Sequence, residues 1–295
     1  MITIAAIRNC TYPVKSMKWI LTIALILSSV TYYPAKVTAQ TKQPATTKQP
    51  VQPTRGGTSP PQGASRPVFV FPKTPARLSP VSGRRVGMGS RNNCPAVPTA
   101  LTALVPLREE QKVSKQTDKS ISGIVEGLTT SERPTFWFYV SYTQNLANSS
   151  AEFILQDNAG NDIYRNALSL PQKPGVIGVS LSSDASLQVG KTYRWYLKVR
   201  CTQQQTANVP IYVEGDIQRV NLDSRVVQQL QAAVDPRQKV AIYAANGIWF
   251  DSLTMLAQLR QKNPNDASVA QDWQSLLRSA NLDNVATAPL VNSPN

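Results

Sequence analysis

The chain has 295 residues, a formal net charge of +14 and no histidine, so it lacks the commonest general base and the commonest zinc ligand. Of its 31 Lys and Arg residues, 14 precede Glu109 without one acidic residue among them, and the other 17 match all 17 Asp and Glu residues. The sequence therefore divides into a basic N-terminal third and a neutral, patterned remainder. We recognise no catalytic motif, metal site or cofactor-binding motif in either part.

The first 39 residues have the features of a signal peptide. Basic residues up to Lys18 precede the apolar run Trp19–Val30, which is shorter than the ~20 residues of a membrane-spanning helix. Val37-Thr38-Ala39 follows a small-x-small cleavage pattern, so we expect a mature N-terminus at Gln40, with Met17 as an alternative start. An uncleaved anchor is the competing interpretation. We expect export to the periplasm or the cell surface.

Residues 40–82 are rich in Pro, Thr, Gln and Ser and predict a disordered basic linker. Its charge suits contact with an anionic envelope polymer, or peripheral contact with a membrane, whereas a solvated spacer is the alternative. We expect no nucleic-acid partner. One apolar segment, Val68–Phe71, is bracketed by Pro67 and Pro72. It either adds an edge strand or docks on the neighbouring domain.

The loop Gly83–Arg91 lacks the GK[ST] sequence and the third glycine of nucleotide-binding loops, so we interpret it as a turn that leads into the next domain. Cys94 and Cys201 remain after the expected cleavage. In an exported protein such a pair predicts one disulfide.

Residues 83–220, which begin with this loop, predict a mainly β domain, an antiparallel immunoglobulin-like sandwich. Seven extended runs carry this prediction: Ile121–Glu126, Thr135–Tyr142, Ala151–Gln156, Ile163–Leu168, Val176–Leu181, Thr192–Cys201 and Ile211–Val220. The separator Asp157–Asp162 departs from the spacing of calcium loops and predicts a hairpin turn.

The run Thr192–Cys201 alternates between two faces. Its apolar face carries Tyr193, Trp195, Leu197, Val199 and Cys201. Its polar face carries Arg194, Tyr196, Lys198 and Arg200. The polar face is a candidate stripe for acidic glycans or phosphates, and an ordinary solvated strand face is the alternative.

Glu214 and Asp216 share a strand face at i, i+2 and form a close carboxylate pair. Glycosidases use two carboxylates roughly 5–9 Å apart, so this pair is a candidate for catalysis. Surface charge is the simpler interpretation.

Residues 221–286 predict a helical appendage, and residues 287–295 a flexible tail. The expected helices are Ser224–Ala233, one that begins at Asp235-Pro236 and ends near Gly247, Ile248–Lys262 and Ala267–Ser279. Asp266 or Ser268 caps the last of them. The last two resemble a tetratricopeptide-like hairpin, which must pack its apolar face on the sandwich or on a partner.

Several stretches together resemble an uncharacterised envelope family of cyanobacteria, known only as a domain of unknown function. They are Gly87–Arg91 with Cys94, TYRWYLKVRC at 192–201, IYVEGDIQRV at 211–220, and Gly247–Asp251 with the following Leu-rich helix. The resemblance spans Gly83 to Leu290. It implies an exported protein of photosynthetic bacteria and supplies no activity or site residue.

We therefore expect a non-enzymatic interaction or structural module of the cell envelope that binds a protein or an anionic glycan. One alternative is an envelope glycan hydrolase that uses Glu214 and Asp216. Another is an accessory subunit that docks through its C-terminal helical hairpin.

Overall fold

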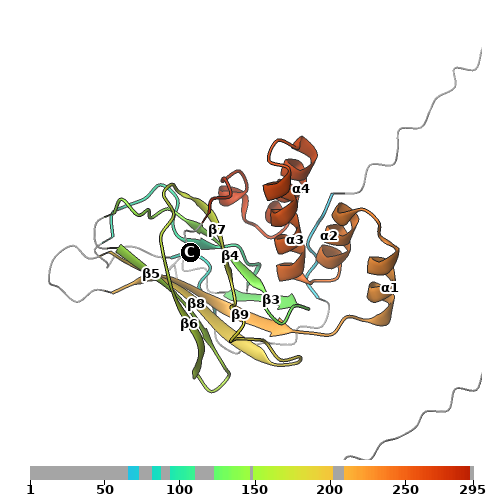
Figure 1. The fold of residues 1–295 in the computed structure, drawn as a ribbon, viewed down its shortest axis with the longest axis horizontal. Helices are drawn as coiled ribbons and strands as arrows, with labels where there is room; N and C mark the ends of the chain where they lie inside the picture. Colours follow the sequence, from blue (N-terminus) through green and yellow to red (C-terminus); the bar gives the residue numbers. More distant parts are fainter. Residues whose placement is uncertain are drawn as a thin grey trace, which may run out of the picture. The chain divides into compact units, whose positions relative to one another are not determined.

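The computed structural model describes residues 66–72, 82–87, 94–109, 123–146, 149–201 and 209–292, all within one compact unit. The expected signal peptide, most of the expected linker and residues 88–93 lie outside the described residues. The described part is mainly β, with four helices toward its C-terminus (Figure 1).

The described strands form two sheets. The three-stranded sheet has the order β1 (Thr102–Ala103), β4 (Thr135–Val140), β7 (Gly175–Ser180). The six-stranded sheet has the order β2 (Leu107–Glu109), β3 (Gly123–Thr129), β9 (Ile211–Arg219), β8 (Thr192–Cys201), β5 (Ser149–Gln156), β6 (Asp162–Leu168).

The six-stranded sheet is mixed, whereas we predicted antiparallel pairing throughout. β3 and β9 are parallel and the other pairs are antiparallel. A parallel pair needs a long crossover connection, and here the chain between β3 and β9 passes through both sheets. The seven predicted strands are otherwise found close to their expected bounds. Among the described strands, only the very short β1 and β2 were not predicted from the sequence.

Aromatic side chains fill the space between the two sheets. The ring of Phe153 in β5 lies 4.8 Å from the ring of Phe136 in β4 and 6.2 Å from that of Phe138. Trp195 of β8 is fully buried, with its ring 5.7 Å from Phe138. The predicted core face of β8 is confirmed, because all five of its residues are at most 4% exposed.

Local capping signals set the helix boundaries. The helices are α1 (Ser224–Ala232), α2 (Pro236–Ala245), α3 (Trp249–Lys262) and α4 (Ala267–Arg278), followed by the 3-10 turn η1 (Asp283–Val285). The carboxylate of Asp235 accepts from the backbone N–H of Arg237 at the start of α2. Asp266, rather than Ser268, caps α4 by accepting from the backbone N–H groups of Ser268 and Val269.

Helix α3 joins the helices to the sheets. Trp249 is fully buried and donates from Nε1 to the carbonyl oxygen of Leu104 at 2.7 Å. On β4, the outward Trp137 donates to Oγ1 of Thr254 at 3.0 Å. Of the two surfaces that the sequence left open for the helical hairpin, the β domain is the one on which it packs, and the two parts share one hydrophobic core.

Three connections fasten the ends of the domain. Cys94 and Cys201 form the predicted disulfide, which joins the leading segment to the end of β8. The guanidinium of Arg85 donates to the carbonyl oxygens of Ala280 and Asn281 just after α4. Residues 289–291, which we predicted to be flexible, pair with Val176 through two backbone hydrogen bonds. They cover the open edge of β7, where bare strand groups would otherwise face water.

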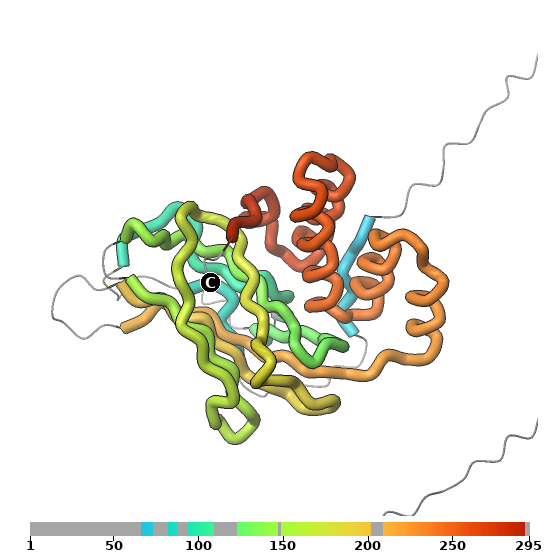
Figure 2. The backbone as a smooth tube through the Cα atoms, viewed as in Figure 1, coloured from blue at the N-terminus to red at the C-terminus, as the bar shows by residue number. Residues whose placement is uncertain are grey.

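Residues 66–72 form a segment that lies beside α2 (Figure 2). The backbone N–H of Val70 donates to the carbonyl oxygen of Ala244 at 3.1 Å, and Phe69 is only 7% exposed. Of the two placements that the sequence left open for this segment, docking is the one found. The prediction of disorder across residues 40–82 does not hold here, because Phe69 and its neighbours bury apolar surface against the helices.

Candidate functional site

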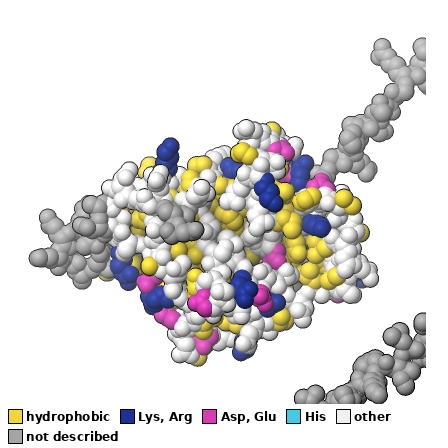
Figure 3. Space-filling model, viewed as in Figure 1, with side chains coloured by type: hydrophobic (Ala, Val, Ile, Leu, Met, Phe, Trp, Pro, Cys, Tyr) yellow, Lys and Arg dark blue, Asp and Glu magenta, His cyan; other side chains and the backbone are white. Residues whose placement is uncertain are grey.

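The outward face of the six-stranded sheet carries the predicted polar stripe of β8. Side chains directly opposite on neighbouring strands share a face, and Arg194, Tyr196 and Lys198 oppose residues of β9. Their respective partners are Asp216, Glu214 and Tyr212. Space filling shows basic and acidic side chains intermingled over the strand half of the visible surface (Figure 3).

Arg194 is held by the two carboxylates that the sequence marked as a candidate catalytic pair. Its Nη2 lies 2.9 Å from Oε2 of Glu214, and its Nη1 lies 3.5 Å from Oδ1 of Asp216. Burial opposes the charge of Arg194, but the hydrogen bond that it donates to Glu214 and the attraction of both acids outweigh it, so the pKa of Arg194 is raised. The first member of the stripe is thus a neutralised structural cation.

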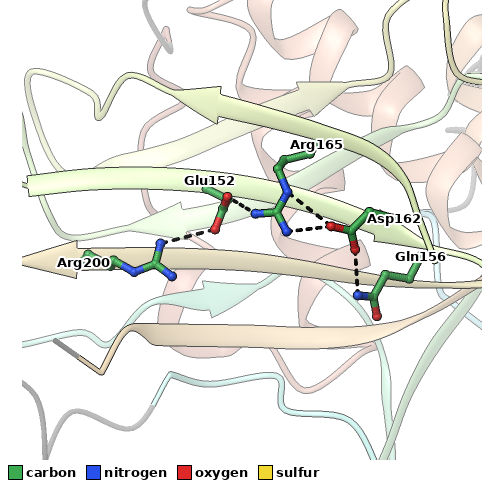
Figure 4. Close-up of polar contacts among 5 residues, drawn as sticks. All are labelled: Glu152, Gln156, Asp162, Arg165 and Arg200. Atoms are coloured by element: carbon green, nitrogen blue, oxygen red, sulfur yellow. Dashed lines mark hydrogen bonds and ion pairs between the residues drawn. The ribbon is translucent and has the colours of Figure 1, made fainter. Parts of the chain in front are cut away.

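Arg200, at the other end of the stripe, belongs to a second charge network (Figure 4). Its Nη1 lies 3.3 Å from Oε1 of Glu152 on β5, and the other oxygen of Glu152 pairs with Arg165 on β6. Arg165 also pairs with Asp162 at 2.6 Å. Burial opposes ionisation of Glu152, but hydrogen bonds from Arg165 and Arg200 outweigh it and lower its pKa. Arg200 is therefore shared with the protein's own carboxylate.

Lys198 and Arg84 are arranged differently from these arginines. In the described part of the chain, neither has a carboxylate within ion-pairing distance, and each lies against a tyrosine. Lys198 Nζ is 5.2 Å from the ring centre of Tyr196, and Arg84 Cζ is 4.3 Å from that of Tyr212. We call these four residues the cation–tyrosine cluster. Burial raises the pKa of Tyr196, so its hydroxyl stays protonated at neutral pH.

Only half of this cluster, Tyr196 and Lys198, was predicted from the sequence. Tyr212 was recoverable, because the alternation of β9 places it on the outward face beside Lys198. Arg84 was not, since it reaches Tyr212 through an isolated bridge between the leading loop and Glu214. Two of the four predicted stripe residues, Arg194 and Arg200, are occupied by carboxylates, and two, Tyr196 and Lys198, belong to the cluster.

The arrangement of Glu214 and Asp216 favours a structural interpretation of that pair. A glycosidase places its two carboxyl groups on either side of the substrate, whereas here both carboxylates are paired with the same arginine. Asp216 is also only 2% exposed, which closes it to a substrate.

A pocket of about 280 Å³ lies where α3 meets the connection between β3 and β4. Its polar lining is largely used inside the protein. Asp251 accepts hydrogen bonds from Thr129 Oγ1 and from the backbone and hydroxyl of Thr130. Thr254 Oγ1 accepts from Trp137. The pocket therefore offers few unused groups, and we do not place the binding site there.

The described residues contain no helix that is both long and apolar enough to cross a membrane, and no group of three metal-ligating side chains. The loop of Asp157 is a hairpin turn as predicted, in which Asp157 Oδ1 accepts from the backbone N–H groups of Ala159 and Asn161.

The protein is a disulfide-linked α-plus-β domain, in which two packed sheets and a helical unit share one core. Its ion-pair networks lie on the outward face of the six-stranded sheet. The chain matches the Domain of Unknown Function family DUF928 over residues 86–290 and belongs to that family. No curated protein matches it. The predicted resemblance to a domain of unknown function is confirmed, and the cyanobacterial source remains an expectation.

Proposed function

We propose that this protein is an exported interaction module of the cell envelope that binds an anionic glycan through the cation–tyrosine cluster. The observation that carries the proposal is that Lys198 lies against Tyr196 on β8, and that Arg84 of the leading loop lies against Tyr212 on the adjoining β9. Tyrosine rings offer flat apolar surfaces for sugar rings, together with hydroxyl groups for hydrogen bonds. The two cations supply charge-assisted hydrogen bonds to carboxylate or sulfate groups.

The neighbouring ion pairs support selectivity for an extended acidic chain. Glu152, Glu214 and Asp216 neutralise Arg165, Arg194 and Arg200, so the surface around the cluster is nearly balanced. Small free anions are therefore not strongly attracted to this part of the surface. A polymer that places acidic groups over Lys198 and Arg84 gains both contacts at once.

Export is part of the same proposal and rests on the sequence of residues 1–39 and on the disulfide. Disulfides persist in oxidising compartments such as the periplasm or the cell surface. N-terminal sequencing of the protein isolated from its native cells tests this directly. A chain that begins at Gln40 is expected, and a chain with its first 39 residues intact in the cytosol contradicts export.

We also propose that the two sheets form an immunoglobulin-like sandwich. The order β9-β8-β5-β6 corresponds to G-F-C-C′ of an immunoglobulin-like variable domain, and β4 and β7 on the facing sheet correspond to B and E. This correspondence supports an immunoglobulin-like sandwich, a fold that often presents binding surfaces.

The accessory-subunit alternative receives less support. The apolar stripe of the helical hairpin, which includes Leu253, Leu256, Trp273, Leu276 and Leu277, is fully buried inside the protein. In the described helices that stripe is thus already covered by the sheets and by neighbouring helices, without a partner protein.

Retention of the purified full chain on immobilised polygalacturonate and on neutral dextran tests the glycan proposal. We expect binding to the acidic polymer alone, weakened on the order of tenfold by Lys198→Gln and by Tyr212→Ala. Lys173→Gln is the matched control, because Lys173 is exposed on the loop between β6 and β7 and carries the same charge.

A second variant, Lys42→Gln with Lys48→Gln, tests how much the basic linker contributes to retention on the acidic polymer. If retention falls equally in the Lys198→Gln and Lys173→Gln variants and further in the linker variant, which loses two charges, binding follows net charge and the proposal is wrong. If only the linker variant loses retention, the linker is the binding element in place of the sheet face.

A further inference from the structure

The helices α2, α3 and α4 form a groove that holds residues 66–72, which we call the docked segment. Phe69 fills the groove, with its ring 5.0 Å from Trp249 of α3 in an edge-to-face arrangement. The backbone N–H of Phe69 donates to Oγ of Ser279 at 2.8 Å, and that of Val70 to the carbonyl oxygen of Ala244. Arg66 donates to Oε1 of Gln271 on α4 at 2.7 Å. A buried aromatic ring, backbone hydrogen bonds and a side-chain hydrogen bond are also the contacts that hold a peptide in a protein groove.

The groove also fits the end of the docked segment. A Cβ atom built on Gly247 would lie 2.6 Å from Cγ of Pro72, so the glycine after α2 leaves room for this proline. Phe71 lies against Phe69 at 5.0 Å, and the guanidinium of Arg108 lies 4.9 Å from the ring centre of Phe71. The groove thus accommodates an aromatic–x–aromatic segment that is followed by proline.

The docked segment is separable from the domain that it contacts. The family match begins at residue 86, so the groove belongs to the family domain and its occupant does not. The other side of the segment is open, with Val68 54% and Val70 47% exposed. Within the described residues the segment belongs to no strand of either sheet.

We propose that this groove is a peptide-binding site, that residues 66–72 occupy it as an exchangeable ligand, and that a second copy of this chain can supply the same segment. Residues 73–81 join the segment to Ser82, a short connection that gives the segment of the same chain an effective concentration of roughly millimolar. The closed monomer therefore dominates in dilute solution. Exchange between copies becomes favourable when many copies are held together.

A labelled peptide that spans residues 64–74 tests whether the groove is exchangeable. It is titrated against full-length protein that carries Phe69→Ala, a change that weakens the internal ligand and leaves the groove intact. We expect the peptide to bind this variant at least about tenfold more tightly than wild type, because the wild-type groove is already filled. A peptide that carries the same Phe69→Ala change should not bind.

Val68→Ala is the matched control, because Val68 points away from the groove and the change should leave peptide binding as in wild type. Near-UV circular dichroism and an intact disulfide show that each variant is folded. A folded Phe69→Ala variant that binds no peptide overturns the proposal, and the docked segment is then a permanent part of the core.

Sedimentation over a range of concentrations tests the second copy. Wild type should form a dimer at hundreds of micromolar, whereas Phe69→Ala, which lacks a competent ligand, should stay monomeric. Wild type that remains monomeric while the free peptide binds overturns exchange between copies and leaves the groove as a site for the internal ligand alone. Equal dimerisation of both proteins also overturns it, since the interface then lies elsewhere.

Discussion

The ring of Phe250 in α3 lies directly against the backbone of Gly127 in β3, and a Cβ atom built on Gly127 would be 2.7 Å from ring carbon Cε2. The same ring lies 5.3 Å from Phe136 between the sheets. Through this contact, α3 packs directly on the β domain. The helical unit keeps its position because β3 has no side chain at residue 127.

Gly127→Ala should therefore destabilise the whole domain. The added methyl group must displace a fully buried ring, and overpacking of this kind costs about 1–3 kcal/mol. Urea denaturation followed by far-UV circular dichroism measures the loss. Combining Gly127→Ala with Phe250→Leu should cost less than the sum of the two single changes, because the smaller side chain makes room for the methyl. Additive losses would mean that the two residues do not share this contact.

The disulfide should carry a large part of the stability. It closes a loop with a sequence separation of 107, and the chain-entropy estimate for such a loop is about 4–5 kcal/mol. Cys94→Ser with Cys201→Ser should lower the free energy of unfolding by this order. Dithiothreitol should destabilise wild type and leave the double variant unchanged. Equal stability of wild type with and without reductant would contradict a structural role for the bond.

Arg194 should matter more for folding than other cations of the sheet face. Its loss removes the charge beside Asp216, whose side chain is 3% exposed, and breaking a buried pair costs about 3–5 kcal/mol. Arg194→Met should thus destabilise strongly. Arg165→Met, in an exposed pair, should cost at most about 1 kcal/mol. Adding Asp216→Asn to Arg194→Met should restore part of the loss, and no recovery would argue against the pair as its cause.

Glu152 should make stability depend on pH in the acid range. Its pKa is lowered in the folded state because the hydrogen bonds from Arg165 and Arg200 outweigh burial. A lowered carboxyl pKa stabilises the folded protein above the unfolded value of about 4.3, and the stabilisation disappears as pH falls below it. Wild type should exceed Glu152→Gln in stability at pH 7, and the difference should shrink toward pH 3. A difference that stays constant from pH 7 to pH 3 would exclude this linkage.

Much of the secondary structure follows from local patterns. The alternation of Thr192–Cys201 places its apolar residues inward, because successive side chains of a strand point to opposite faces. Asp235-Pro236 marks the start of α2, since an aspartate cap and a first-turn proline both favour a helix start. The two cysteines left after the expected cleavage suffice to predict their pairing.

The candidate site was only partly predictable. Lys198 and Tyr196 follow from one strand, but the lack of an ion pair at Lys198 among the described residues depends on which cations the acids of β5 and β9 contact. The sequence alone gave Arg194 and Lys198 the same status. The pairing of the opposing acids separates them. Glu214 and Asp216 pair with Arg194, whereas Glu152, which opposes Lys198 on β5, pairs with Arg165 and Arg200.

The amino-acid sequence by itself determined the periodicity of the strands, the helix caps, the turn at Asp157 and the division of charge, since each depends on residues a few positions apart. The tertiary structure alone decided the parallel pairing of β3 with β9, the stacking of Arg84 on Tyr212 and the burial of Phe69 against Trp249. These contacts join residues far apart in the chain. Their formation depends on the packing of the whole domain, which no local pattern encodes.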